Sequence, residues 1–171
     1  MISASCFAFL QLLAANNNRD WFNKHKDRYL RETATVEHFV QRLLDELNLH
    51  DSIETPGGKS AMHRIYRDTR FGTDKTPYAP RWSGSFRRAT KFRRGGYYFH
   101  LEPGGKSLIA GGFRGPNADD LKRIREDIAF DDTPLRKILK SKSFTDTFGT
   151  LQGEQVKTAP KGFSAAHEAI D

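Results

Sequence analysis

The chain has 171 residues, of which 37% are hydrophobic and 12% aromatic, and this is enough for one domain with a core of its own. Its net charge of +7 is regional, because residues 59–98 hold eleven basic and two acidic residues, a local balance of +9. The single cysteine, Cys6, excludes an internal disulfide, and the apolar stretch 6–15 is too short to span a membrane and lacks a basic leading region, so we expect a cytoplasmic protein.

The first third of the chain is expected to be helical, with Cys6 as a small buried hydrophobe. Ser5 can cap a helix that ends at Asn16-Asn17-Asn18, because asparagine tolerates the left-handed backbone found at helix ends. Asn18 or Asp20 can cap a second helix that runs to about Thr33. A third helix carries apolar residues at spacings of three and four, which predicts one packed stripe. The stripe consists of Val36, Phe39, Val40, Leu43, Leu44 and Leu47.

The middle third is expected to form strands at residues 62–67, 82–88, 97–102 and 107–113. The last two are predicted to pair as a hairpin across Pro103-Gly104-Gly105. Since strand side chains alternate between faces, the apolar residues of the strand 97–102 should face the core and the polar ones should face away. The apolar set is Tyr97, Phe99 and Leu101, and the opposite set is Tyr98, His100 and Glu102.

The last third returns to helices. Asn117 can cap a helix that bears Leu121 and Ile128, and Thr133-Pro134 can start another. Helices, then strands, then helices, without strict alternation, predict an α+β fold with a central, mainly antiparallel sheet of about four strands. We expect residues 1–171 to form a single domain.

The run HRIYRDTRFGTDKTPYAP, residues 63–80, is the most informative stretch, because it interleaves cations, carboxylates and aromatics in a way that neither a plain strand nor a plain surface loop requires. If the neighbouring strand lies beside it, this run and the hairpin could bind an anionic group and move a proton. The candidate residues are Arg67, Asp68, Arg70, Asp74, Lys75, Tyr78, His100 and Glu102. The structural alternative is that Arg67 with Asp68, and Asp74 with Lys75, form ion pairs that only hold the loop in shape.

Signatures of established chemistries are incomplete. Gly58-Lys59-Ser60 and Gly105-Lys106-Ser107 lack the glycine that a phosphate-binding P-loop needs five residues earlier, and both are interpreted as turns. The sequence also has no nucleophile elbow, no dinucleotide-binding glycine loop and no histidine pair at metal-ligand spacing. We therefore predict neither a cofactor nor a metal, and the sequence leaves open whether the protein is an enzyme and what its oligomeric state is.

Several motifs in this order resemble the uncharacterised bacterial and fungal family called domain of unknown function 2461. They are Arg19-Asp20-Trp21-Phe22, Arg67-Asp68-Thr69-Arg70-Phe71, Asp74-Lys75-Thr76-Pro77-Tyr78, Gly96-Tyr97-Tyr98 and Gly111-Gly112. The resemblance runs from about Phe9 to the end and implies a family but no activity. Members of that family continue well past the segment 160–163, so the resemblance implies a chain that is truncated or unusually short.

The leading hypothesis is a pocket between the 63–80 run and the 97–113 hairpin that binds a phosphorylated or other anionic small molecule. Arg67, Arg70 and Lys75 would bind the anion, Asp68 or His100 would be the base, and Tyr78 would be an orienting donor, with Asp74 and Glu102 also in the pocket. A competing hypothesis is a nucleic-acid-binding module, with Trp82, Phe86 and Phe92 as stacking faces. Its cations would be Arg81, Arg87, Arg88, Lys91, Arg93 and Arg94. A third is an interaction domain with no small-molecule site.

Overall fold

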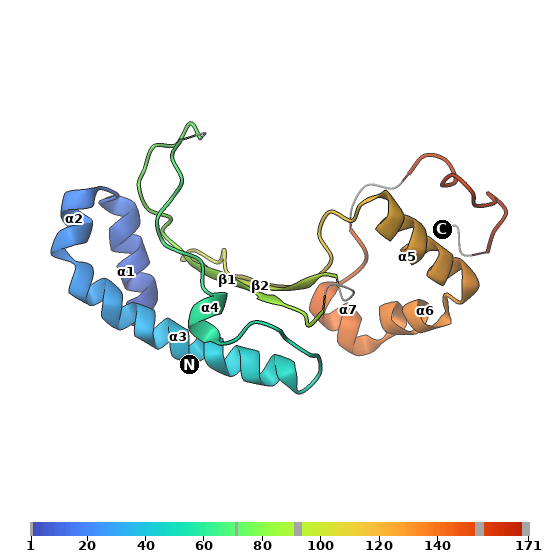
Figure 1. The fold of residues 1–171 in the computed structure, drawn as a ribbon, viewed down its shortest axis with the longest axis horizontal. Helices are drawn as coiled ribbons and strands as arrows, with labels where there is room; N and C mark the ends of the chain where they lie inside the picture. The colour runs from blue at the N-terminus through green and yellow to red at the C-terminus, as the bar shows by residue number, and fades with distance from the viewer. Residues whose placement is uncertain (1, 71, 91–93, 153–155, 169–171) are drawn as a thin grey trace. The chain divides into compact units, whose positions relative to one another are not determined.

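The computed structural model describes residues 2–70, 72–90, 94–152 and 156–168. The chain forms two compact units, an N-terminal unit, Met1–Arg114, and a C-terminal unit, Gly115–Asp171. Each is described by itself. The N-terminal unit is α+β, with helices followed by a three-stranded antiparallel sheet, and the C-terminal unit is helical (Figure 1). The predicted fold class is therefore confirmed.

Three helices open the N-terminal unit: α1 (Ala4–Ala15), α2 (Arg19–Lys24) and α3 (Lys26–Asn48). The Asn18 side chain caps α2 by accepting a hydrogen bond from the backbone N–H of Trp21 at 2.9 Å, as predicted. The expected helix boundary near Thr33 is wrong, because the break lies at His25 and α3 runs through Thr33 without interruption. The Thr33 hydroxyl donates to the carbonyl of Tyr29 at 2.7 Å, a bond that accommodates this β-branched residue inside the helix.

The sheet consists of β1 (Trp82–Arg87), β2 (Gly96–Leu101) and β3 (Leu108–Gly112), in the order β1-β2-β3. The predicted hairpin is present, and Phe99 of β2 pairs with Gly84 on one side and Ile109 on the other. A fourth strand at 62–67 does not form in the described residues. That segment makes only isolated bridges, from Met62 to Gly84 and from Tyr66 to Tyr78.

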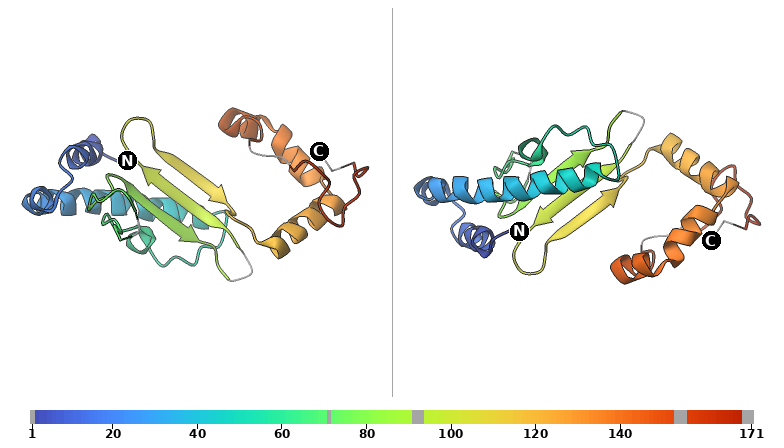
Figure 2. Two further views of the ribbon diagram at one scale, coloured as in Figure 1. Left: turned by 90° about the horizontal axis from the view of Figure 1, so that it is seen from above. Right: turned by 90° about the horizontal axis from the view of Figure 1, so that it is seen from below.

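The core lies between one face of the sheet and the helices. Trp82, Phe86, Phe99 and Leu101 alternate along β1 and β2 and are buried, as predicted for the two β2 residues. Helix α3 runs along this face (Figure 2). The helices contribute Cys6, Phe9, Leu10, Leu13, Phe22, Val36, Val40, Leu44 and Ala61 to the core.

A short helix, α4 (Gly58–Ala61), packs closely on both α3 and the sheet. A Cβ atom at Gly58 would lie 2.6 Å from the backbone nitrogen of Gln41, and one at Gly84 would lie 2.3 Å from the carbonyl oxygen of Ala61. Both positions therefore require glycine for close backbone approach. Residues that were expected to form only a turn, Gly58-Lys59-Ser60, are thus part of this helix.

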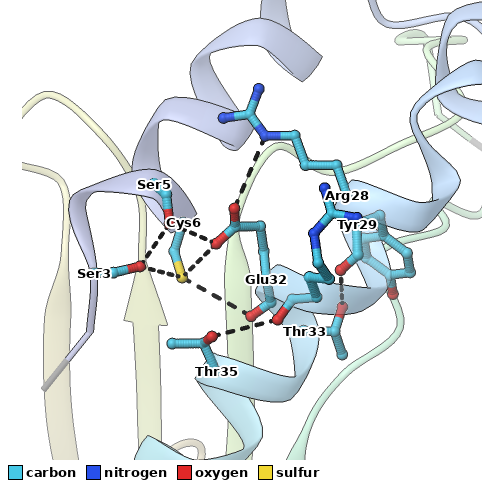
Figure 3. A network of polar contacts seen from close by, with 9 residues as sticks. Ser3, Ser5, Cys6, Arg28, Tyr29, Glu32, Thr33 and Thr35 are labelled. Carbon is cyan, nitrogen blue, oxygen red and sulfur yellow. Dashed lines mark hydrogen bonds and ion pairs between the residues drawn. The ribbon is translucent and has the colours of Figure 1, made fainter.

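The core also holds one polar cluster, between α1 and α3. The buried Glu32 carboxylate accepts hydrogen bonds from the Ser5 hydroxyl at 2.8 Å and the Cys6 thiol at 3.2 Å, and Nε of Arg28 lies 3.9 Å from its other oxygen (Figure 3). Burial, together with the Glu32 carboxylate, raises the pKa of the Cys6 thiol. Cys6 is a structural thiol of the core, as expected from the sequence.

The C-terminal unit contains α5 (Ala118–Phe130), α6 (Thr133–Lys140) and α7 (Lys142–Phe148). As predicted, Asn117 caps α5, where it forms a capping box with Asp120, and Pro134 lies in the first turn of α6. These three helices contain no buried residue among those described. None of the described helices of either unit is long and apolar enough to cross a membrane.

Candidate functional site

The described residues of the informative run, 63–70 and 72–80, form a hairpin-like segment between α4 and β1, which we call the arm (Figure 1). The backbone N–H of Arg67 donates to the carbonyl of Pro77 at 2.9 Å, and that of Ala79 donates to Ile65 at 2.8 Å. Ile65 and Tyr78 are buried at the base of the arm. The residues nearest the base are therefore fixed by the core, while the cations beyond them lie at the surface.

The arm is fastened to the turn between α1 and α2. Both groups of the Asn17 amide bind the backbone of Tyr78, where Oδ1 accepts from N–H at 3.1 Å and Nδ2 donates to the carbonyl at 2.9 Å. The Tyr78 ring stacks on Phe22 of α2, with ring centroids 4.0 Å apart. These contacts position two segments of the chain on either side of a surface hollow.

This hollow, which we call the arm pocket, has a volume of about 490 Å³. The arm provides one wall, and the α1–α2 turn with α2 provides the other, in place of the 97–113 hairpin expected from the sequence. The described residues that line it include three cations and three asparagines but no carboxylate. They are Asn17, Asn18, Arg19, Asn23, Tyr66, Arg67, Thr69, Lys75, Pro77 and Tyr78.

The three cations differ in how they are held. Arg67 forms an ion pair with Asp74, whose carboxylate is also bound by the backbone and hydroxyl of Thr76. The pKa of Asp74 is lowered, mainly by the hydrogen bonds from Thr76 and to a smaller extent by Arg67. Lys75 donates to the carbonyl of Thr69 at 2.8 Å. Among the described residues, neither Lys75 nor Arg19 has a carboxylate within ion-pair distance, so the arm pocket holds uncompensated positive charge.

Asp68 and Arg70 lie on the arm but outside the lining of the arm pocket. Nε and Nη2 of Arg70 donate to the Asp68 carboxylate at 3.0 and 2.7 Å, and the Arg70 backbone N–H donates to it at 3.1 Å. Both side chains are more than half exposed. The hydrogen bonds from Arg70 lower the pKa of Asp68. Ion pairs do hold the arm, but with other partners than the predicted ones, since Asp68 pairs with Arg70 rather than Arg67, and Asp74 pairs with Arg67 rather than Lys75.

His100 and Glu102 lie on the sheet face opposite the core, as the alternation in β2 predicted, and they do not line the arm pocket. His100 Nε2 lies 2.8 Å from Glu102, and this contact lowers the pKa of the carboxylate. Because a carboxylate only accepts, Nε2 of His100 donates to it, while Nδ1 lies 3.2 Å from the Tyr98 hydroxyl. This face thus carries an ordered chain of Tyr98, His100 and Glu102.

The same face holds further polar residues that the sequence analysis missed. His63 places its two ring nitrogens near the hydroxyls of Ser85 at 3.2 Å and Ser83 at 3.4 Å. The signal was present in β1, where Ser83, Ser85 and Arg87 alternate with Trp82, Gly84 and Phe86. The α1–α2 residues of the arm pocket were also missed as site residues, because they are far from the arm in sequence.

Among the described cations proposed to bind nucleic acid, Arg87, Arg88 and Arg94 contact other residues of the fold. Arg88 pairs with the partly buried carboxylate of Asp51 at 2.5 Å, and Nη1 of Arg87 lies 3.9 Å from Glu54, while Arg81 is exposed. Arg94 lies over the ring of Phe113 at 5.1 Å. Lys91 and Arg93, with Phe92, lie outside the described residues. The expectation that Trp82 and Phe86 offer stacking faces is wrong, because both rings are buried in the core.

The described residues contain no group of three or more His, Cys, Asp and Glu side chains arranged to hold a metal ion. Comparison with known proteins adds a family but no chemistry. The profile of a family described as conserved hypothetical protein (DUF2461) matches residues 5–171. No curated protein and no solved structure matches the chain. Since the family match covers almost the whole sequence, the chain belongs to the DUF2461 family of conserved hypothetical proteins.

Proposed function

We propose that the protein binds a phosphorylated or otherwise anionic small molecule in the arm pocket. The observation that carries the proposal is the composition of the lining, which combines Arg19, Arg67 and Lys75 with no carboxylate among its described residues. Positive charge gathered in a hollow attracts anions and focuses the field on them. The volume of about 490 Å³ lies within the usual range for small-molecule sites.

The roles of the three cations follow from their contacts. Arg19 and Lys75 have no carboxylate partner in the described part of the chain, so an anion can bind them without breaking an ion pair. Arg67 is held in place by Asp74 and adds charge from a fixed position. Because the two candidate bases, Asp68 and His100, lie outside the lining, these contacts support binding rather than turnover. The proposal assumes the cytoplasmic location expected from the sequence.

The proposal is tested by calorimetric titration of inorganic phosphate and pyrophosphate into the wild type and into Arg19→Gln and Lys75→Gln variants. We expect binding to the wild type and a loss of about tenfold or more in each variant, because a charged hydrogen bond contributes about 1.5–3 kcal/mol. The matched control is Arg42→Gln, which removes the same charge from the exposed surface of α3. Equal loss in the control would show that only net charge matters.

A nucleic-acid interface predicts a different result. Affinity for a single-stranded oligonucleotide would then fall steeply with salt and would weaken when Arg81 and Arg87 become Gln, while Lys75→Gln would have no special effect. The described contacts of Arg87, Arg88 and Arg94 lend this reading less support than the arm pocket has.

A further inference from the structure

One lining residue of the arm pocket is not explained by anion binding. Tyr66 lies beside the three cations with 57% of its surface exposed, although a large aromatic residue is more often buried. Its ring is supported from behind by Phe22, with centroids 5.9 Å apart in an edge-on arrangement, and by Tyr78 at 5.4 Å. The ring is thus held in place while much of it faces solvent.

The asparagines of the arm pocket also differ in which side-chain amide groups they leave available for a ligand. The Asn17 amide is fully engaged by the backbone of Tyr78. Asn18 uses its oxygen to cap α2 and keeps its amide N–H groups. The Asn23 amide has no hydrogen-bond partner among the described residues, so it presents both a donor and an acceptor to the hollow.

From these observations we infer that the ligand is a phosphate ester bearing a planar aromatic ring, the chemistry of a mononucleotide. The phosphate would bind Arg19, Arg67 and Lys75, the ring would stack on Tyr66, and the amide of Asn23 would bind the edge of the base. This inference rests on the proposed function and adds the class of the ligand. A bare phosphate ion would use the cations but leave the tyrosine and the amide without a role.

Stacking on an exposed, preordered ring is an established way of holding a base. Base–aromatic stacking contributes about 1–3 kcal/mol, which corresponds to about fivefold or more in affinity. The contribution does not depend on the sugar or on the phosphate, so it can be separated from charge by changing either the ligand or the protein.

The ligand-side experiment compares adenosine 5′-monophosphate, ribose 5-phosphate and inorganic phosphate by titration calorimetry on the full chain. We expect the monophosphate to bind about fivefold or more tightly than ribose 5-phosphate, because only the former carries a ring. Equal affinities for the two would overturn the inference of an aromatic ligand while leaving anion binding intact. If none of the three binds, the proposed function fails as well.

The protein-side experiment replaces the ring. Tyr66→Leu should lower affinity for adenosine 5′-monophosphate by about fivefold or more and leave that for ribose 5-phosphate unchanged, whereas Tyr66→Phe should retain both. Unchanged monophosphate affinity in a folded Tyr66→Leu protein would overturn the inference. If Tyr66→Leu does not fold, the comparison of ligands on the wild type still tests whether the ligand needs an aromatic ring. Affinity for oligothymidylates that rises with each added nucleotide would also overturn it, in favour of a nucleic-acid strand.

Discussion

At the scale of single residues, Asn17 has the most direct influence on the arm pocket. Its amide makes two hydrogen bonds to the backbone of Tyr78, and no other residue type of that size offers a donor and an acceptor in the same plane. The residue positions the arm without any charge of its own, and in the proposed site it would act on binding only through that position. Its effect should therefore appear in both stability and affinity.

We predict that Asn17→Ala lowers the free energy of unfolding by about 1–3 kcal/mol, because it leaves partly buried backbone groups of Tyr78 without partners. Urea denaturation measures this loss. Asn17→Asp keeps the acceptor for the Tyr78 N–H but sets a second acceptor against the Tyr78 carbonyl, so it should not restore wild-type stability. An Asn17→Ala protein with wild-type stability would mean that water replaces the two hydrogen bonds from Asn17 to Tyr78.

A second residue-scale effect concerns Asp51, whose pKa is lowered from 3.8 to about 2, first by the hydrogen bond from Arg88. The hydroxyl of Tyr97 also donates to this carboxylate, at 3.0 Å. Together they fasten the loop after α3 to β1 and β2. Arg88, expected to contact nucleic acid, is thus engaged within the fold.

Because the pKa of Asp51 is lower in the folded than in the unfolded state, its contribution to stability is present above the usual pKa and is lost as pH falls towards the folded value. We predict that wild-type stability decreases between pH 3.8 and about 2, and that Asp51→Asn flattens this part of the curve. Denaturation midpoints across that range give the measurement. Parallel curves for the two proteins would contradict the linkage.

At the scale of elements, the apolar spacing in α3 correctly predicted a packed stripe, but it did not rank the residues within it. Val36, Val40 and Leu44 are fully or almost fully buried, whereas Phe39, Leu43 and Leu47 are partly buried at the edge of the core. The reason is geometric, since a stripe at spacings of three and four is wider than the line of closest contact with the sheet.

The two neighbouring leucines of this stripe provide a matched pair. We predict that Leu44→Ala lowers the free energy of unfolding by about 2–5 kcal/mol, as truncation of a buried leucine does, and that Leu43→Ala costs less. Chemical denaturation of both variants tests the ranking. A larger loss at Leu43 would place the centre of the helix face one residue earlier.

Some elements could not be predicted because specific hydrogen bonds, rather than composition, decide them. Thr33 and Thr35 resemble a helix end in sequence, yet their hydroxyls bind carbonyls of the preceding turn, at 2.7 and 3.3 Å, and α3 continues through them. Residues 62–67 have the composition of a strand, but Tyr66 finds a bridging partner in Tyr78 of the same arm rather than in the sheet. Local propensity did not determine either outcome.

At the scale of the whole molecule, the sequence identified one wall of the arm pocket and missed the other. Arg67, Lys75 and Tyr78 were named because they crowd a short run. Asn17 and Asn18 form an ordinary polar turn after α1, and Arg19 and Asn23 lie on the short helix α2. Their local sequence does not mark them as neighbours of the arm. The separation of His100 and Glu102 from the arm pocket likewise depends on the observed strand pairing, which the sequence did not define.

All buried apolar residues of the described chain, from Cys6 to Leu101, belong to the N-terminal unit. A fragment of residues 1–114 therefore carries this entire core, and we predict that it unfolds cooperatively on heating, as a small domain does. Circular dichroism and calorimetry of the fragment test this prediction. A fragment without a cooperative transition would show that residues after 114 are required for folding. That result would agree with the expectation of a single domain over residues 1–171.

The clamp between Asn17 and Tyr78 also has a consequence for the order of folding. The two residues are 61 positions apart, and the chain between them includes all of α3. Contacts across such a separation require a long loop to close, whereas the helices form from local contacts in microseconds or less. During refolding, the helical signal should therefore recover before the proposed binding of phosphate returns. The delay between the two signals would measure how slowly the arm docks on the α1–α2 turn after the helices have formed.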